Sequence, residues 1–312
     1  MMRIDLRYPL AITEQPQQVL VMGFFDGVHR GHQQVLKTAK KIADERGLEL
    51  AVLTYDPHPA VVFEKFDAPL TYLTTVDKKV ALLTQYGAQR VYVMNFTSQL
   101  AALPPQVFVD DVLMALNPAV VVAGFDHTYG ADKTVSDMAT LPQYAKKRFD
   151  VVAVPAFPLD GPKVASRDLR AALAVGDVDL VNVDLGRVYE TTGLVVHGEA
   201  RGRELGFPTA NIQTPMLERL PGIGIYAVEI QVGGIWYQAM ASIGRNVTFG
   251  DGRPVTVEIN ILNFNQAIYG EHVVVRWCHY LRGEVKFTGA PALIEQLKQD
   301  QQATEAWFAA RS

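Results

Sequence analysis

The chain of 312 residues contains a single cysteine, Cys278, which excludes an intrachain disulfide framework. Because it lies in an apolar and aromatic run, we expect an inert buried thiol. Long apolar runs are also missing: the longest, such as residues 119–125 and 151–157, have the length of strands rather than the ~20 residues of a membrane span. The first residues lack the apolar segment of a secretory signal, so we expect a cytoplasmic protein.

An excess of one charge is likewise absent. The 29 basic and 33 acidic residues give a net charge of −4, which disfavours a surface that follows a nucleic-acid backbone. The apolar fraction of 49% and the charged fraction of 20% are ordinary for globular proteins and do not fit a disordered chain. At roughly 150 residues per domain, the length predicts two domains.

The first half alternates short β-branched runs with helix-length segments. The predicted strands, most of them continuously apolar, are residues 18–22, 49–55, 90–96, 119–125 and 150–157. Among the predicted helices are residues 31–46, which Gly47 ends, and residues 104–117. This alternation predicts an α/β fold with an open, mostly parallel sheet, in which ligands bind beyond the carboxyl ends of the strands.

The second half has a different texture. Residues 186–287 read as strands separated by glycine turns, which predicts an antiparallel β-barrel or sandwich. Residues 291–311 return to helical periodicity and predict a closing helix. A helical connector over residues 166–185 joins the halves, so the predicted domains are residues 1–185 and 186–312.

A glycine-rich stretch, residues 23–32, joins the first predicted strand to the first helix. A helix N-terminus at this place favours a bound phosphate. His29 and His32 are three residues apart, so both rings can donate hydrogen bonds to a polyphosphate. The alternatives are a zinc pair or two surface histidines. The glycines that would let backbone and ligand approach closely are Gly23, Gly27 and Gly31.

The pattern Gly-x-Phe-Asp-Gly-Val-His-x-Gly-His of this stretch resembles the signature of the prokaryotic bifunctional riboflavin kinase/FAD synthetase family. Residues 55–59, 70–83 and 124–130 resemble further motifs of its N-terminal, Rossmann-like nucleotidyltransferase module, in order. The resemblance implies FMN adenylyltransferase activity, with His29 and His32 as catalytic residues. It implies ATP binding by Gly23, Phe24, Asp26, Gly27, His29, Gly31, His32, Ser166, Arg167 and Arg170, and flavin binding by Pro57, His58, Pro59 and Asp126.

Three residues of the first half depart from the family pattern. In the connector, Ala165 and Arg167 stand where the family's Ser-Ser-Thr-x-x-Arg motif has hydroxyls, although Arg167 offers a bidentate fork to phosphate. This departure leaves open a riboflavin kinase whose adenylyltransferase domain is degenerate. His127 stands where the family has phenylalanine, on the flavin side.

Residues 193–211 contain four glycines within fourteen residues, with Arg201 and Arg203 between them, as expected of a loop that wraps a polyphosphate. Thr209 and Asn211 alternate in position, so in an extended segment their oxygens face the same way and suit Mg²⁺. On composition alone, a glycine-rich hairpin remains the alternative.

This string resembles the riboflavin kinase signature that ends in Pro-Thr-Ala-Asn, and the segments after it resemble that module in order. The resemblance implies that Glu258, a carboxylate inside an alternating strand, is the general base, and that Thr209 and Asn211 hold Mg²⁺. Arg245 and Val247 depart from the family pattern in a turn. The implied ATP-binding residues are Gly198, Arg201, Gly202, Arg203, Gly206, Phe207, Thr209 and Asn211.

The resemblance covers nearly the whole chain and implies two reactions: phosphorylation of riboflavin to FMN, and adenylylation of FMN to FAD. ATP is the co-substrate and Mg²⁺ the cofactor. We expect small-molecule substrates, no nucleic-acid or membrane partner, and a monomer or weak homo-oligomer. A non-catalytic flavin or nucleotide sensor and a different nucleotidyltransferase are the alternatives. The lysine pairs at residues 40–41, 78–79 and 146–147 are interpreted as solvated helix faces.

Overall fold

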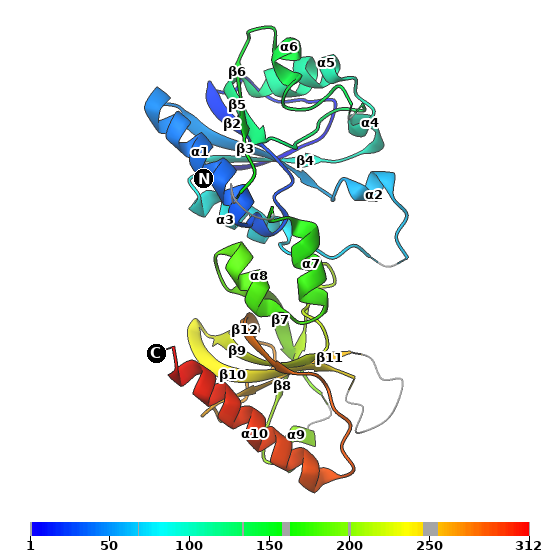
Figure 1. The fold of residues 1–312 in the computed structure, drawn as a ribbon, viewed down its shortest axis with the longest axis vertical. Coiled ribbons are helices and arrows are strands. Elements are labelled where there is room, and N and C mark those ends of the chain that lie inside the picture. Colours follow the sequence, from blue (N-terminus) through cyan, green and yellow to red (C-terminus); the bar gives the residue numbers. More distant parts are fainter. Residues whose placement is uncertain are drawn as a thin grey trace. The chain divides into compact units, whose positions relative to one another are not determined.

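The computed structural model describes residues 2–67, 69–132, 134–157, 163–198, 201–245 and 255–311, without the side chains of Arg201 and Glu204. The chain forms two compact units, Met1–Ser166 and Arg167–Ser312 (Figure 1). The second compact unit therefore includes nearly all of the predicted connector, residues 166–185. The functional boundary at residue 185 stays a prediction. No helix in the described part of the chain is both long and apolar enough to span a bilayer.

The first unit is built on a parallel sheet with strand order β1-β4-β3-β2-β5-β6. Each of the five predicted strands has a counterpart, which confirms the α/β prediction. The strand that sequence reasoning missed is β1, an edge strand with mostly exposed side chains. The strands are β1 (Met2–Leu6), β2 (Gln18–Met22), β3 (Glu49–Asp56), β4 (Arg90–Asn95), β5 (Pro118–Gly124) and β6 (Asp150–Val154).

Both faces of this sheet are covered by apolar side chains, and β2 at its centre is buried along its whole length. Helices α1 (Arg30–Arg46) and α3 (Val76–Gln85) contribute to the core on one face. The other face packs against α4 (Ser98–Ala101), α5 (Pro105–Val107), a π-turn (Phe108–Leu113), a 3-10 turn (Met114–Leu116) and α6 (Leu141–Ala145). The predicted helix over residues 104–117 is thus present but irregular.

The expected end of the first long helix is confirmed. Gly47 caps α1 with φ 65°, a left-handed conformation that favours glycine. A short helix, α2 (Ala60–Phe63), follows β3.

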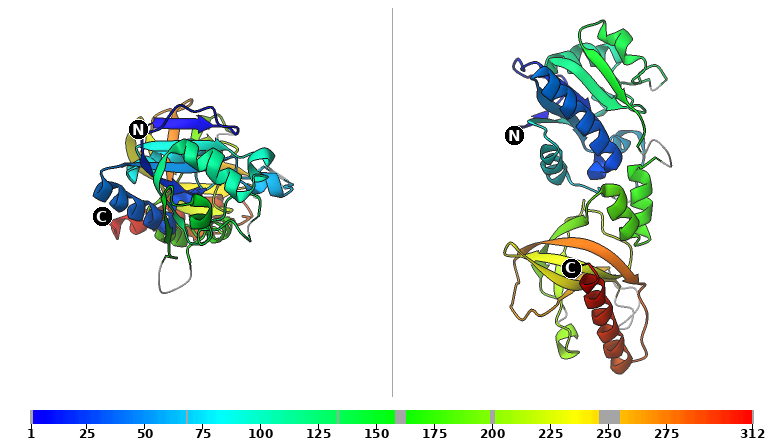
Figure 2. Two further views of the ribbon diagram at one scale, coloured as in Figure 1. Left: turned by 90° about the horizontal axis from the view of Figure 1, so that it is seen from above. Right: turned by 60° about the vertical axis from the view of Figure 1, so that its left-hand side comes forward.

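The second unit is a closed antiparallel barrel with strand order β10-β11-β8-β7-β12-β9, which decides between the barrel and the sandwich. The predicted closing helix is α10 (Ala290–Ala309), which runs along the barrel and contacts β9, β10 and β12 (Figure 2). The strands are β7 (Tyr189–Val196), β8 (Ala210–Gln213), β9 (Gly224–Val232), β10 (Ile235–Gly244), β11 (Thr256–Ile261) and β12 (His272–Arg282).

Helices α7 (Ser166–Ala174) and α8 (Val178–Leu185) precede the barrel. Asn182 ties α8 to it, because its Nδ2 donates to the Trp277 carbonyl at 2.9 Å and its Oδ1 accepts from the Tyr189 amide at 2.7 Å. Burial raises the pKa of the Cys278 thiol to about 12, which confirms the expected inert cysteine.

Candidate active sites

The first candidate site lies where the strand order of the parallel sheet reverses. Strand β2 pairs with β3 on one side and with β5 on the other. The connections that follow β2 and β5 run toward opposite edges of the sheet, so the loops after these two strands diverge. A cavity of about 550 Å³ lies there, lined by the ends of both strands and by residues 163–166. Its size and aromatic lining are typical of a small-molecule site.

The loop between β2 and α1 is folded tightly. Residues Asp26–Val28 form a 3-10 turn. Phe25, just before the turn, has φ 58°, and Gly27, inside it, has φ 81°. A Cβ at Gly23 would lie 2.6 Å from the Phe25 ring, so glycine is needed at that position. We call residues 23–29 the phosphate loop, because it leads directly into the N-terminus of α1.

The two predicted histidines come together at this helix start. Their rings stack with centroids 3.7 Å apart, and His29 Nδ1 caps the helix by accepting from the His32 amide at 3.4 Å. Burial, with the nearby His29, Lys79 and Lys163, lowers the pKa of His32 well below its ordinary value, so its imidazole is neutral near pH 7. Its buried Nδ1 has no hydrogen-bond partner among the described residues.

Two of the predicted ATP-binding residues brace the phosphate loop. Asp26 is 1% exposed, and its Oδ1 accepts from the Thr74 amide at 3.1 Å. Thr74 Oγ1 in turn accepts from the Gly27 amide at 3.0 Å. Ser166 Oγ donates to the Asp26 carbonyl at 2.8 Å and also lines the cavity. These contacts hold the loop from two separate segments.

The structure contradicts the interpretation of the lysine pair at residues 78–79 for Lys79. Its side chain is 2% exposed, so the expected solvated helix face is wrong at this position. Lys79 follows Val76 and precedes Val80 and Leu83, and this apolar spacing places it on the stripe that faces the sheet. That apolar spacing is the signal in the sequence that indicates burial of Lys79. Lys146 and Lys147 are exposed, but they form a turn with positive φ after α6.

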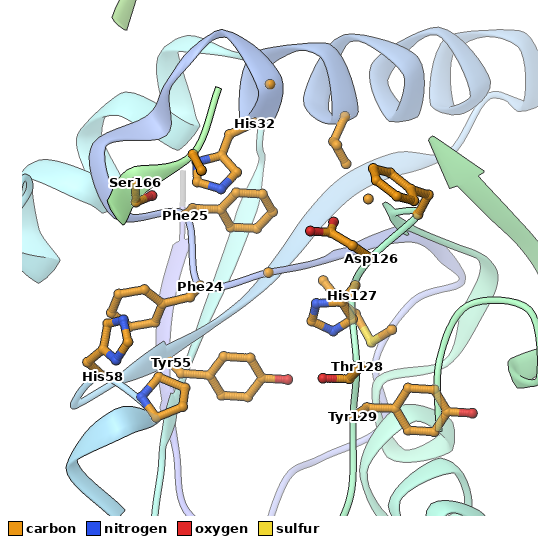
Figure 3. A pocket seen from close by; sticks show the side chains of 18 of the residues that line it. Phe24, Phe25, His32, Tyr55, His58, Asp126, His127, Thr128, Tyr129 and Ser166 are labelled. Atoms are coloured by element: carbon orange, nitrogen blue, oxygen red, sulfur yellow. The ribbon is translucent and has the colours of Figure 1, made fainter. Parts of the chain in front are cut away.

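Of the predicted flavin-side residues, His58, Pro59 and Asp126 line this cavity, and Pro57 is not part of its lining. Figure 3 shows Phe24, Tyr55 and His58 on one side, and Asp126 with His127 on the other. His58 meets the Phe24 ring edge-on at 4.3 Å, and Asp126 pairs with Lys163.

His127 is a second polar group on the same side of the cavity as Asp126. Burial lowers its pKa to about 4, so the imidazole is neutral at physiological pH. Its buried Nε2 has no partner within the described part of the chain. It can therefore donate to, or accept from, a ligand in the cavity.

The two connector arginines, Arg167 and Arg170, fall outside the first unit. Both lie on α7 in the second unit. The side chain of Arg167 is 92% exposed and lies 3.6 Å from Asp168, while the Arg170 carbonyl accepts from Arg219. Their contacts with ATP stay predictions.

The second candidate site lies on neighbouring strands of the barrel. Glu258 in β11 pairs in register with Asn211 in β8. Thr209 Oγ1 donates to Glu258 Oε2 at 3.2 Å, and Asn260 Nδ2 donates to the Pro208 carbonyl at 2.8 Å. The structure therefore brings the predicted base and the predicted metal ligands together from segments about fifty residues apart.

The preceding glycine loop closes onto this cluster. A Cβ at Gly198 would overlap the amide of Asn211, and a Cβ at Gly202 would overlap the Phe207 carbonyl. The Phe207 amide donates to the Gly202 carbonyl at 2.8 Å, around a short helix, α9 (Arg201–Glu204). The side chain of Arg203 is exposed, whereas those of Arg201 and Val247 lie outside the described residues.

Comparisons with known proteins match both halves of the chain. The family model for FAD synthetase matches residues 11–168, and that for riboflavin kinase matches residues 185–308. The chain is 43% identical over 311 residues to the bifunctional riboflavin kinase/FMN adenylyltransferase of Listeria monocytogenes, with 99% of each covered. It is 38% identical over 312 residues to that of Bacillus subtilis, covering 99% of this chain and 98% of the relative.

A solved structure has the same fold. A crystal structure from Streptococcus pneumoniae, described as a macrolide-efflux protein, superposes with a TM-score of 0.91 at 35% identity. The match covers 98% of this chain and 100% of that one.

Proposed function

The chain belongs to the family of bifunctional riboflavin kinase/FMN adenylyltransferases, and from this premise we propose which residues of each unit carry its two reactions. The barrel unit phosphorylates riboflavin to FMN, and the α/β unit adenylylates FMN to FAD. The observation that carries the assignment is that each unit holds its own constellation: the phosphate loop with its cavity in one, and Glu258 bonded to Thr209 in the other.

In the α/β unit, a phosphate oxygen of FMN attacks the α-phosphorus of ATP, and the bond to the departing pyrophosphate breaks. No covalent enzyme intermediate is needed, so catalysis rests on positioning and on stabilising charge. His29, His32 and the N-terminus of α1 face the phosphates. The neutral imidazole of His32 suits this role because it still offers one N–H donor. Ser166, Arg167 and Arg170 are further candidates for phosphate contacts.

The flavin ring occupies the aromatic part of the same cavity. Phe24 and His58 form one wall there, and Asp126 and His127 another. Pro57 and Pro59 flank His58 and shape its loop. A flat heteroaromatic ring fits such a lining, because stacking and edge contacts add to apolar burial.

In the barrel unit, Glu258 accepts the proton of the primary hydroxyl of the ribityl chain. The oxygen of that hydroxyl attacks the γ-phosphorus of ATP, and ADP leaves. The glycine loop, with Gly198, Gly202, Gly206 and Phe207, encloses the phosphates, and Arg201 and Arg203 supply positive charge.

The residues around Glu258 fit Mg²⁺. Thr209 and Asn211 offer a hydroxyl and an amide oxygen beside a carboxylate, and hard oxygen donors are what this cation prefers. Among the described residues, no group of three His, Cys, Asp or Glu side chains could hold a softer metal. When bound there, Mg²⁺ would neutralise charge on the phosphates of ATP.

One experiment tests both assignments and the remaining alternative. Purified protein is incubated with ATP and Mg²⁺ and either riboflavin or FMN, and the flavins are separated by chromatography. FAD formed from FMN is the expected result. FMN formed from riboflavin without any FAD would favour the kinase with a degenerate first unit, an alternative raised by Ala165 and Arg167 in place of the family's hydroxyls. If the protein forms neither FMN nor FAD, the result would favour a non-catalytic sensor.

A further inference from the structure

The most unusual charged group outside the assigned sites is Lys79 on α3. Its side chain is 2% exposed, and it lies beneath the phosphate loop rather than in the cavity lining. A buried ammonium is costly unless it is hydrogen-bonded. Three contacts offset the cost of burying the Lys79 ammonium. All three are made with residues that line the proposed adenylyltransferase site.

These contacts join the loop that follows β2 to the end of β3. Lys79 Nζ donates to the Phe24 carbonyl at 3.0 Å and to the Tyr55 carbonyl at 3.1 Å. It also lies over the Phe24 ring, 4.1 Å from the centroid. Thr54 Oγ1 donates to the same Phe24 carbonyl at 2.9 Å. Phe24 is therefore held by side chains from two different elements.

We propose that Lys79 is a positioning residue for adenylyl transfer, whose ammonium pins the phosphate loop to the end of β3 and so orients Phe24 and the helix start that receives ATP. This inference rests on the proposed function of the first unit. Lys79 acts through Phe24 and Tyr55 and does not touch the reacting atoms.

The charged state of Lys79 gives the inference a distinct signature. Burial lowers its pKa to about 8, against the opposing effects of Asp26 and Asp56. The charged or titratable groups around it are Asp26 in the phosphate loop, Asp56 at the end of β3, His32 on α1 and, beside it on α3, Asp77 and Lys78. Below pH 8 the ammonium makes charge-assisted bonds, and above pH 8 the neutral amine makes weaker ones.

The first measurement is the pH profile of FAD formation by the native full-length protein. We expect kcat/KM for ATP to fall above about pH 8, because this ratio reports groups of the free enzyme. In Lys79→Arg the guanidinium stays charged, so this fall should move beyond pH 10. A fall near pH 8 that is unchanged in Lys79→Arg, or no fall in the native protein, would overturn the inference.

The second measurement removes the charge. Lys79→Met keeps the length of the side chain but loses both hydrogen bonds, and kcat/KM for ATP in FAD formation should drop about 10- to 100-fold below pH 8. FMN formation from riboflavin by the same molecules should not change, which shows that the protein is intact. Lys37→Met, at an exposed lysine of α1, is the matched control.

Two failures can be told apart. If native protein makes no FAD from FMN, the proposed function of the first unit is wrong. If native protein makes FAD and Lys79→Met makes it within two-fold of native, only the role of Lys79 is wrong. Circular dichroism shows whether Lys79→Met unfolds the first unit. If it does, the pH profiles of Lys79→Arg and of the native protein decide whether Lys79 has the proposed role.

Discussion

The two units bind the same co-substrate with different architectures. In the α/β unit, the proposed site is a cavity between diverging loops, where burial keeps the imidazoles of His32 and His127 neutral. In the barrel unit, the site is a short cluster on paired strands, where a half-buried carboxylate accepts a bond from Thr209. The difference follows the chemistry, since attack by an FMN phosphate needs no base, whereas attack by an alcohol has a proton to lose.

The strongest test of this contrast removes the base. Glu258→Gln should lower kcat for FMN formation by about 10² to 10⁴, because an amide cannot accept the proton. FAD formation from supplied FMN should stay unchanged, as measured by chromatography. Glu295→Gln, at an exposed glutamate of α10, is the control. Near-normal FMN formation by Glu258→Gln would remove the distinction between the two sites.

The complementary change lies at the start of α1, directly after the phosphate loop. His32→Ala should lower FAD formation about 10²-fold, the usual scale for losing one positioned donor, and should leave the kinase reaction intact. Because the pKa of His32 is lowered well below its ordinary value, lowering the pH from 7 to 6 should not charge it. A loss of FAD formation between pH 7 and 6 that disappears in His32→Ala would contradict this description.

A smaller effect is expected from the glycine loop of the barrel. Gly202→Ala places a Cβ against the Phe207 carbonyl, so the loop must shift. The KM for ATP in FMN formation should rise about ten-fold with a smaller change in kcat, as expected when binding is the main loss. Steady-state kinetics at saturating riboflavin measure this, with Gly283→Ala, whose Cβ would meet only the Tyr280 hydroxyl at 3.5 Å, as the comparison. An unchanged KM would show that the loop does not enclose ATP.

The smallest effect concerns His127. His127→Phe removes a buried imidazole from the flavin wall, and the KM for FMN in FAD formation should rise a few-fold because one neutral hydrogen bond is lost. The KM for ATP serves as the internal control and should not move. A KM for FMN that stays the same or falls would show that His127 makes no bond to the flavin.

Much of this organisation could be predicted from local patterns. Apolar runs such as residues 119–125 predicted the buried strands, and Gly47 predicted the end of α1. Strand β1 could not be found this way, because an edge strand buries little and carries Arg3 and Asp5. The prediction of a solvated helix face is wrong at Lys79, because a pair of adjacent lysines in the sequence does not show whether one of them faces the core.

The sequence by itself determined the two fold classes, the order of elements and the motif residues, since these depend on periodicity and on spacing along the chain. Tertiary structure decided which of those residues meet. It placed Glu258 against Thr209 on neighbouring segments of the barrel, turned Asp26 into a brace for the phosphate loop, and buried Lys79 beneath that loop. Such contacts join segments tens of residues apart, so burial and hydrogen-bond partners, which set the chemistry of each group, exist only in the folded chain.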